Sequence, residues 1–255
     1  METIHIARTE AKYRVRAEEL PAMRDWLLRY CVPDENSRGG DWYAIRSLYL
    51  DSSEFRMYRD SEQKLAYRVK LRARAYGDAS GSVKLEVKRR VLGQIVKTSA
   101  TVKAEQWESA SAVGLRGFCD LGKPSMGEFL QLADSLHATP QMLIYYERQA
   151  FSSTVDEYVR VTFDRSVQCQ AVREWDLRGD DRAWLSLDGP GGFGETASSY
   201  ILEVKFQDAP PAWLRDLVLT FGLERRGGSK YVKAMQRGMF YREPAWDLVS
   251  ARGAA

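Results

Sequence analysis

"KLAYRVKLRARAYG", residues 64–77, places a cation at every second position of one short segment. A period of two predicts a β-strand whose alternate side chains point to opposite faces. Like charges in such a row repel one another, and an ordinary solvated face would dilute them with neutral or acidic residues. The pattern therefore indicates a face that meets an anion. The cations are Arg68, Lys70, Arg72 and Arg74, and the apolar positions between them are Val69, Leu71 and Ala73.

The composition bounds the class of protein. The chain has 255 residues, 44% of them hydrophobic, which is enough for a sizeable core. Its net charge is only +3, because 38 Lys and Arg nearly balance 35 Asp and Glu. A chain so balanced lacks the global positive charge that coats nucleic acid, so its basicity is local and no nucleic-acid partner is expected. No repeat or linker divides the sequence, and we expect one domain over residues 1–255.

Cysteine and histidine exclude several chemistries. Cys31, Cys119 and Cys169 are odd in number and far apart, which disfavours a disulfide framework or a zinc site and favours a reducing compartment. His5 and His137 are the only histidines, and neither lies near a nucleophile motif. No stretch resembles a signal peptide or a membrane span. We therefore expect a cytoplasmic protein.

The alternation recurs along the chain, and residues 17–31 and 104–136 have helical character. Residues 176–199 lack a period and predict a loop. These patterns predict an α+β fold with about eight mostly antiparallel strands and helices on their apolar face. The charged faces can look outward around an apolar core, the commoner outcome, or inward to line a polar tunnel. Strand patterns occur in residues 4–15, 42–52, 82–90, 93–102, 141–151, 157–165 and 199–207.

Several motifs together resemble a known family. The chain looks like the catalytic domain of the vacuolar transporter chaperone polyphosphate polymerases, a branch of the triphosphate tunnel metalloenzymes, over roughly residues 5–240. The resemblance implies an antiparallel β-barrel whose tunnel binds triphosphate, polyphosphate and Mg²⁺ or Mn²⁺. It also implies transfer of the ATP γ-phosphoryl group to a polyphosphate chain. The motifs, in order, are "RTEAKYRV", "LRARAYG", "VKLEVKRR", "YYERQAF", "VRVTFD", "ILEVKF" and "GSKYVKAM".

The resemblance also assigns roles to single residues. One departure is Arg8, which stands where the wider superfamily has the first of two glutamates. That exchange removes a carboxylate from the implied metal site. The implied catalytic residues are Lys12, Arg72, Arg74, Lys88, Arg148 and Arg160; the implied substrate-binding residues are Lys205, Lys230 and Lys233; the implied metal ligands are Glu203, Glu10 and Glu86.

Phosphoryl transfer fits these residue types without reference to any family. Charge spreads over the oxygens of the transferring group, and arginines and a metal ion neutralise it. Guanidinium groups stay charged at any working pH and bind phosphate oxygens in pairs. The acceptor decides between a polymerase and a metal-dependent tripolyphosphatase or nucleoside triphosphatase, and a polyphosphate-binding module without turnover is a further alternative. The chain could act alone or with a separate membrane-protein partner at the inner face of a membrane.

Overall fold

A single antiparallel sheet organises the computed structural model, which describes residues 8–92, 94–188, 199–225 and 228–240. Eight strands follow the order β1-β10-β8-β7-β3-β4-β5-β6, while β2 pairs with β7 and β9 with β8. The strands are β1 (Arg8–Arg16), β2 (Cys31–Pro33), β3 (Tyr43–Asp51), β4 (Tyr67–Tyr76), β5 (Val83–Val91), β6 (Gln94–Val102), β7 (Thr139–Ser153), β8 (Arg160–Ala171), β9 (Leu185–Ser186) and β10 (Ser199–Gln207).

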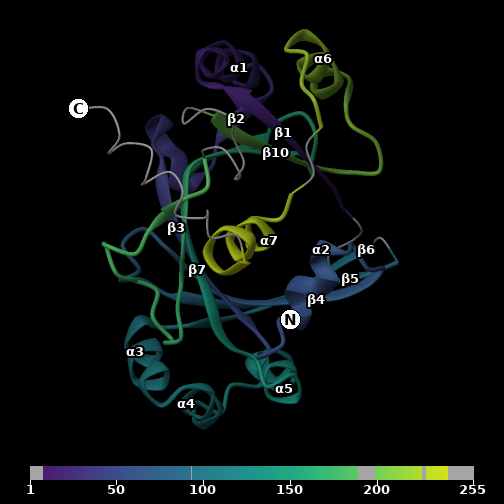
Figure 1. Ribbon diagram of the computed structural model, residues 1–255. Coiled ribbons are helices and arrows are strands. Elements are labelled where there is room, and N and C mark those ends of the chain that lie inside the picture. The colour runs from purple at the N-terminus through teal and green to yellow at the C-terminus, as the bar shows by residue number, and fades with distance from the viewer. Residues whose placement is uncertain (1–7, 93, 189–198, 226–227, 241–255) are drawn as a thin grey trace, which may run out of the picture.

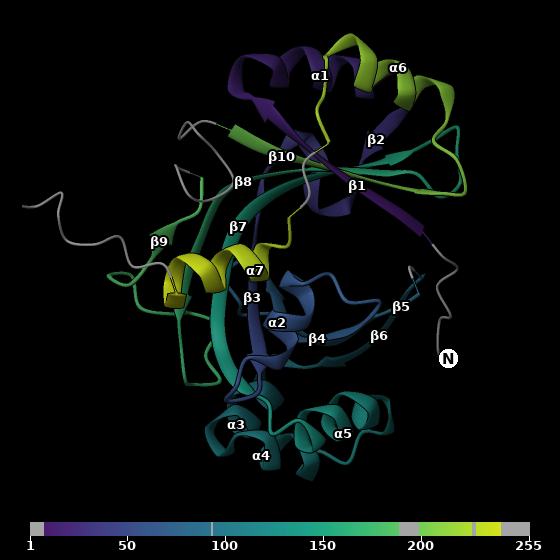
Figure 2. The same cartoon turned by 45° about the vertical axis from the view of Figure 1, so that its right-hand side comes forward.

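Two groups of helices cover the convex side of this curved sheet (Figures 1 and 2). One group is α1 (Leu20–Leu27) and α6 (Ala212–Thr220), beside β1 and β10. The other is α3 (Ala104–Val113), α4 (Leu115–Asp120) and α5 (Gly127–Ser135), beside β4, β5 and β6. The remaining helices are α2 (Arg56–Glu62) and α7 (Lys230–Met235), with short 3-10 helices at Ala17–Glu19, Glu35–Gly40 and Pro124–Met126 and a π-helix at Gln236–Phe240.

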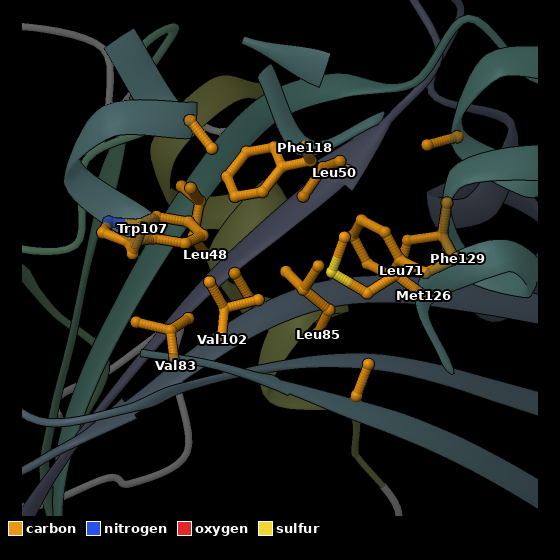
Figure 3. Close-up of a cluster of buried hydrophobic side chains, with 14 of the residues drawn as sticks. Leu48, Leu50, Leu71, Val83, Leu85, Val102, Trp107, Phe118, Met126 and Phe129 are labelled. Atoms are coloured by element: carbon orange, nitrogen blue, oxygen red, sulfur yellow. The ribbon is translucent and has the colours of Figure 1, made fainter. Parts of the chain in front are cut away.

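The apolar faces of the strands explain this arrangement. Leu71 on β4 and Leu85 on β5 are almost fully buried, and they point with Phe129 and Trp107 into one cluster under α3 and α5 (Figure 3). A second cluster, around Phe163, lies under α1 and α6. Burying this apolar surface is the main source of stability for both halves of the sheet. The helices therefore occupy the convex side, and the charged faces turn toward the concave side.

Helix α7 lies on the concave side, between the two halves of the sheet (Figure 2). The Tyr231 ring stacks on Tyr49 of β3, with 4.7 Å between ring centroids. The Tyr231 hydroxyl donates to Asp51 Oδ2 at 2.5 Å. The same carboxylate accepts from the backbone N–H groups of Met57 and Tyr58 at the start of α2. One buried aspartate thus ties α2 and α7 to the end of β3.

The expected closed barrel is wrong in one respect. The fold is α+β with an antiparallel sheet, as predicted, but no backbone pairing joins β1 to β6 within the described ranges, so the sheet is open. A closed barrel of about eight strands holds side chains or one small ligand. Here the concave side also holds α7, of which Tyr231, Ala234 and Met235 are fully buried. The sheet therefore wraps around a helix instead of closing on itself.

Most other expectations about the elements are confirmed. Residues 104–136 are helical, broken into α3, α4 and α5, and the predicted strands are present. Strand β9 falls within the predicted loop 176–199, of which residues 189–198 lie outside the described part. Strand β2 and helix α6 had no prediction. In the described part of the chain, no helix is long and apolar enough to cross a membrane.

Candidate functional site: a charged concave face

The charged positions of the strands share the concave face. Pairing places Lys12 of β1 opposite Glu203 of β10, and Arg72 of β4 opposite Glu86 of β5. Side chains also meet across the open gap, where Lys88 Nζ of β5 donates to Glu10 Oε2 of β1 at 3.1 Å. Of the two orientations that the sequence allows for the charged strand faces, outward or inward, the structure has the inward one. Four carboxylates, Glu10, Glu86, Asp164 and Glu203, organise the cations there; we call them and their cation partners the paired interior.

Glu10 and Glu203 share Lys12. Lys12 Nζ lies 3.2 Å from Glu10 Oε1 and 3.4 Å from Glu203 Oε2. Lys205 Nζ is 2.7 Å from the other oxygen of Glu203, and Lys88 approaches Glu10. These five side chains come from β1, β10 and β5. Alternating positive and negative groups of this kind stabilise both signs of charge in a partly dry setting.

The ionisation of both glutamates follows from these contacts. Burial and the neighbouring Glu203 oppose ionisation of Glu10, but Lys12 and Lys88 outweigh them and lower the pKa of Glu10 to about 2. Burial also opposes ionisation of Glu203, yet Lys205 and Lys12 hold its pKa well below the usual range. Burial lowers and the two glutamates raise the pKa of Lys12, and the net shift is upward. All three groups are therefore charged at neutral pH.

Glu86 forms a separate cluster with three cations. Its side chain is 1% exposed, and its Oε2 lies 2.5 Å from Arg72 Nε and 3.6 Å from Arg74 Nε. Lys97 of β6 forms a further ion pair with its other oxygen. Burial opposes ionisation, but Arg72 and Arg74 lower the pKa of Glu86 below its usual range. Arg72 also donates to the hydroxyl of Tyr49 at 3.0 Å.

Asp164, which was not among the residues predicted from the sequence, organises the third cluster. Arg148 donates to it through two nitrogens, Nε to Oδ1 at 2.6 Å and Nη2 to Oδ2 at 2.8 Å. Lys230 of α7 donates to Oδ2 at 2.5 Å. Asp164 is fully buried. It lies in phase with Arg160 and Thr162 of the same strand, and that alternation was a signal that could have identified it.

Two predicted residues lie apart from these clusters. Arg160 stands at the start of β8, where it pairs with Asp34 at 2.5 Å and its side chain is 47% exposed. Lys233 is partly exposed in α7, and its backbone N–H donates to the Ser229 carbonyl. The structure brings the other ten predicted residues together on the concave face.

Lys70 belongs to the same face but was not among the predicted site residues. Its Nζ donates to Ser229 Oγ at 2.6 Å, just before α7. It lies directly opposite Lys88 in the β4–β5 pairing. The pKa of Lys70 is lowered to about 7, and burial of the side chain is the largest cause. Repulsion from Lys88, Lys12 and the flanking cations of β4 lowers it further. Lys97 of β6 was also not among the predicted site residues, although it lies directly opposite Lys88 in the β5–β6 pairing.

The donors available to a metal ion are limited. No group of three or more His, Cys, Asp or Glu side chains with suitable geometry occurs in the ranges that the structure describes. Mg²⁺ typically takes one or two carboxylates and completes its shell with water and substrate phosphates. Glu10 and Glu203, both ionised and joined through Lys12, fit that donor set. Glu86 is instead enclosed by Arg72, Arg74 and Lys97.

Comparisons with known proteins give one family match and several similar solved structures. Similar solved structures include a candidate adenylate cyclase from Vibrio parahaemolyticus, with 13% identity, TM-score 0.47 and coverage of 89% of this chain and 97% of the other. Another is a protein from Pyrococcus horikoshii OT3, with 10% identity, TM-score 0.42 and coverage of 88% of this chain and 94% of the other. No curated protein matches the sequence. The model of the VTC domain matches residues 7–238, and the chain therefore belongs to the VTC domain family.

Proposed function

We propose that this chain is a polyphosphate polymerase that transfers the γ-phosphoryl group of ATP to the end of a polyphosphate chain. A terminal phosphate oxygen of the polyphosphate attacks the γ-phosphorus of ATP, the bond between that phosphorus and the bridging oxygen breaks, and ADP leaves. The polyphosphate grows by one phosphate. A nucleoside triphosphatase would direct water to the same phosphorus and release free phosphate.

The observation that carries the proposal is the convergence of cations on the concave face. Arg72 and Arg74 come from β4, Arg148 from β7 and Lys230 from α7, and each is held in place by Glu86 or Asp164. Catalysis of phosphoryl transfer depends mainly on positioned charge, because negative charge spreads over the oxygens of the transferring group. Arginines fixed by buried carboxylates supply that charge without reorganising.

Each remaining residue has a proposed role in the same reaction. Glu10 and Glu203 would hold Mg²⁺ or Mn²⁺, which when bound offsets the charge of the phosphate oxygens. Lys12, between the two carboxylates, and Lys88 and Lys205, beside them, would bind phosphate oxygens that approach this point. We propose that Lys233 and Arg160 contact the substrate farther from the reacting phosphorus, and that Glu86 positions Arg72 and Arg74.

The partners implied by this function are ATP, triphosphate and polyphosphate. A separate membrane protein is a further proposed partner, through which a cytoplasmic domain would work at the inner face of a membrane. Nothing in the charge balance calls for nucleic acid, because the net charge of +3 leaves no global positive surface.

Incubation with ATP and Mn²⁺, followed by gel electrophoresis and staining for polyphosphate, tests the proposal. A ladder of polymer with matching ADP is the expected result. Free phosphate without a ladder would replace the polymerase with a hydrolase. Tight binding of triphosphate without either product would identify a polyphosphate-binding module. Glu203→Gln is the matched variant, and it should retain triphosphate binding while losing metal-dependent turnover.

A further inference from the structure

Three cations at one end of the concave face lack the carboxylates that the paired interior has. Arg68 lies directly opposite Arg90 in the β4–β5 pairing, and Lys70 lies directly opposite Lys88. No ion pair joins Arg68, Lys70 or Arg90 to a carboxylate of the described residues. We call Arg68, Lys70 and Arg90 the unpaired end. Arg68 and Lys70 belong to the basic row of residues 64–77, and the proposed reaction uses none of the three cations.

The unpaired end is unfavourable for the empty protein. Like charges directly opposite one another on adjacent strands are destabilising. Burial and the charge of Arg90 lower the pKa of Arg68. The groups facing Lys70 are Arg68 and Arg72 on its own strand, Lys88 on β5 and Lys12 on β1. A sheet selected for stability alone would place an acidic or neutral residue among these positions.

Ser229 adds a hydroxyl to the same place. It immediately precedes α7 and occupies the N-cap position, but its side chain makes no cap hydrogen bond. Its Oγ instead accepts from Lys70 Nζ. A hydroxyl that accepts one hydrogen bond still has its own proton to donate. Lys70 and Ser229 therefore present N–H and O–H donors side by side, and both suit a phosphate oxygen.

Arg68 and Arg90 lie beyond the reach of the triphosphate site, and Lys70 lies between them and Arg72. A strand rises about 3.3 Å per residue, so Arg68 is about 13 Å along β4 from Arg72 and about 20 Å from Arg74. A triphosphate held at Arg72 and Arg74 does not extend that far, whereas a longer chain lying along β4 does. Arg90 is exposed to solvent, so this end of the face is open to a chain that enters or leaves.

We infer that Arg68, Lys70 and Arg90, with the Ser229 hydroxyl, form a second anion site that binds phosphoryl groups of a chain longer than triphosphate. This inference rests on the proposed function, and it adds a preference for chain length. Each added phosphate oxygen would meet a cation without displacing a carboxylate. The paired interior would bind triphosphate and long chains alike, and Arg68 and Arg90 of the second site would bind only the long ones.

Titration calorimetry with triphosphate and with long-chain polyphosphate, at fixed ionic strength, tests the inference on the full chain. Wild type should bind the long chain more tightly per site. Arg68→Gln with Arg90→Gln should remove about tenfold of that advantage, which is roughly one charge-assisted hydrogen bond, and leave the affinity for triphosphate within about twofold of wild type. The melting temperature of the empty double variant should not fall, because it loses a repulsion.

Arg89→Gln is the matched control, because Arg89 is the neighbour of Arg90 but pairs with Glu128 of α5 on the convex side. It should bind both ligands as wild type does. Equal long-chain advantage in wild type and the Arg68/Arg90 double variant would overturn the second site while leaving the triphosphate site in place. Failure of wild type to bind triphosphate at all would overturn the proposed function, and the inference with it.

Discussion

The paired interior and the unpaired end lie on the same face of the same strands, yet their charges are arranged differently. In the paired interior, buried Glu86 and Asp164 each meet at least two cations. At the unpaired end, Arg68 faces Arg90 and Lys70 faces Lys88. The first arrangement is stable in the empty protein, because each buried charge has a partner. The second becomes favourable only when an anion arrives. Strand β4 therefore carries both cations that are already paired with carboxylates and cations that become paired only when an anion binds.

The largest effect should come from removing a central carboxylate. Asp164→Asn removes the carboxylate that pairs with the buried Arg148 and Lys230, and breaking a buried ion pair in this way costs about 3–5 kcal/mol. Urea unfolding should show that loss in the free energy of unfolding. Triphosphate should stabilise this variant more than it stabilises wild type, because it supplies the missing negative charge. A loss below about 1 kcal/mol would mean that Asp164 does not stabilise the buried cations of the paired interior.

Arg72→Ala with Arg74→Ala should have a smaller but clear effect on stability. The sequence alone predicts no loss, because it shows only four cations that repel. In the structure the two arginines are partners of Glu86, which is 1% exposed, so we expect a loss of about 1–3 kcal/mol together with loss of polyphosphate binding. Denaturant unfolding and calorimetry measure the two effects. Unchanged stability would show that Lys97 alone satisfies Glu86.

Lys70→Met should change stability in the opposite direction and in a pH-dependent way. Burial and the neighbouring cations lower the pKa of Lys70 in the folded protein to about 7, from an ordinary value of 10.5. Below pH 7 the amine is charged in both the folded and the unfolded state, so the free-energy cost of burying its charge is fully present. As the pH rises from 7 toward 10.5, the amine loses its proton in the folded state and this cost disappears. The variant should therefore melt a few degrees higher than wild type at pH 6 and equally at pH 10.5. A difference independent of pH would show that Lys70 is not held among cations.

The smallest effect should come from an exposed pair far from the concave face. Arg178 and Glu108 lie 3.1 Å apart with side chains 75% and 67% exposed. Exposed ion pairs contribute about 0–1 kcal/mol. Glu108→Gln should therefore leave the unfolding free energy and triphosphate binding unchanged within error. A loss as large as that of Asp164→Asn would show that burial does not distinguish the paired interior from the surface.

The alternation along each strand was enough to predict much of the fold. The period of two in residues 64–77 identified both the apolar face under α5 and the charged face. It did not reveal that β1 and β6 stay unpaired or that α7 packs on the concave side, because a local pattern does not report which distant segments meet. Helix α6 was missed although two prolines precede it directly, which is a pattern typical of a helix start.

The site could be predicted in part. The motifs identified ten of the residues that the concave face brings together. They did not identify Asp164, although it shares the phase of Arg160, because the strand expected from the sequence ends at residue 165 and a single aspartate near a strand end is typical of the surface. Arg160 was expected beside the others, but Asp34, more than a hundred positions away in sequence, draws it to the periphery. Such pairings depend on tertiary contacts that alternation does not encode.

Calorimetric titration with triphosphate tests the central claim, that the concave cations bind a phosphate chain, most directly. Wild type should bind one triphosphate per chain in a saturable manner, more weakly as salt rises. Arg72→Gln, folded as judged by its melting transition, should bind at least about tenfold more weakly, because a charge-assisted hydrogen bond is lost. Sulfate at matched ionic strength should not replace triphosphate. Equal triphosphate affinity in wild type and Arg72→Gln would contradict the account, as would the absence of saturable binding in wild type.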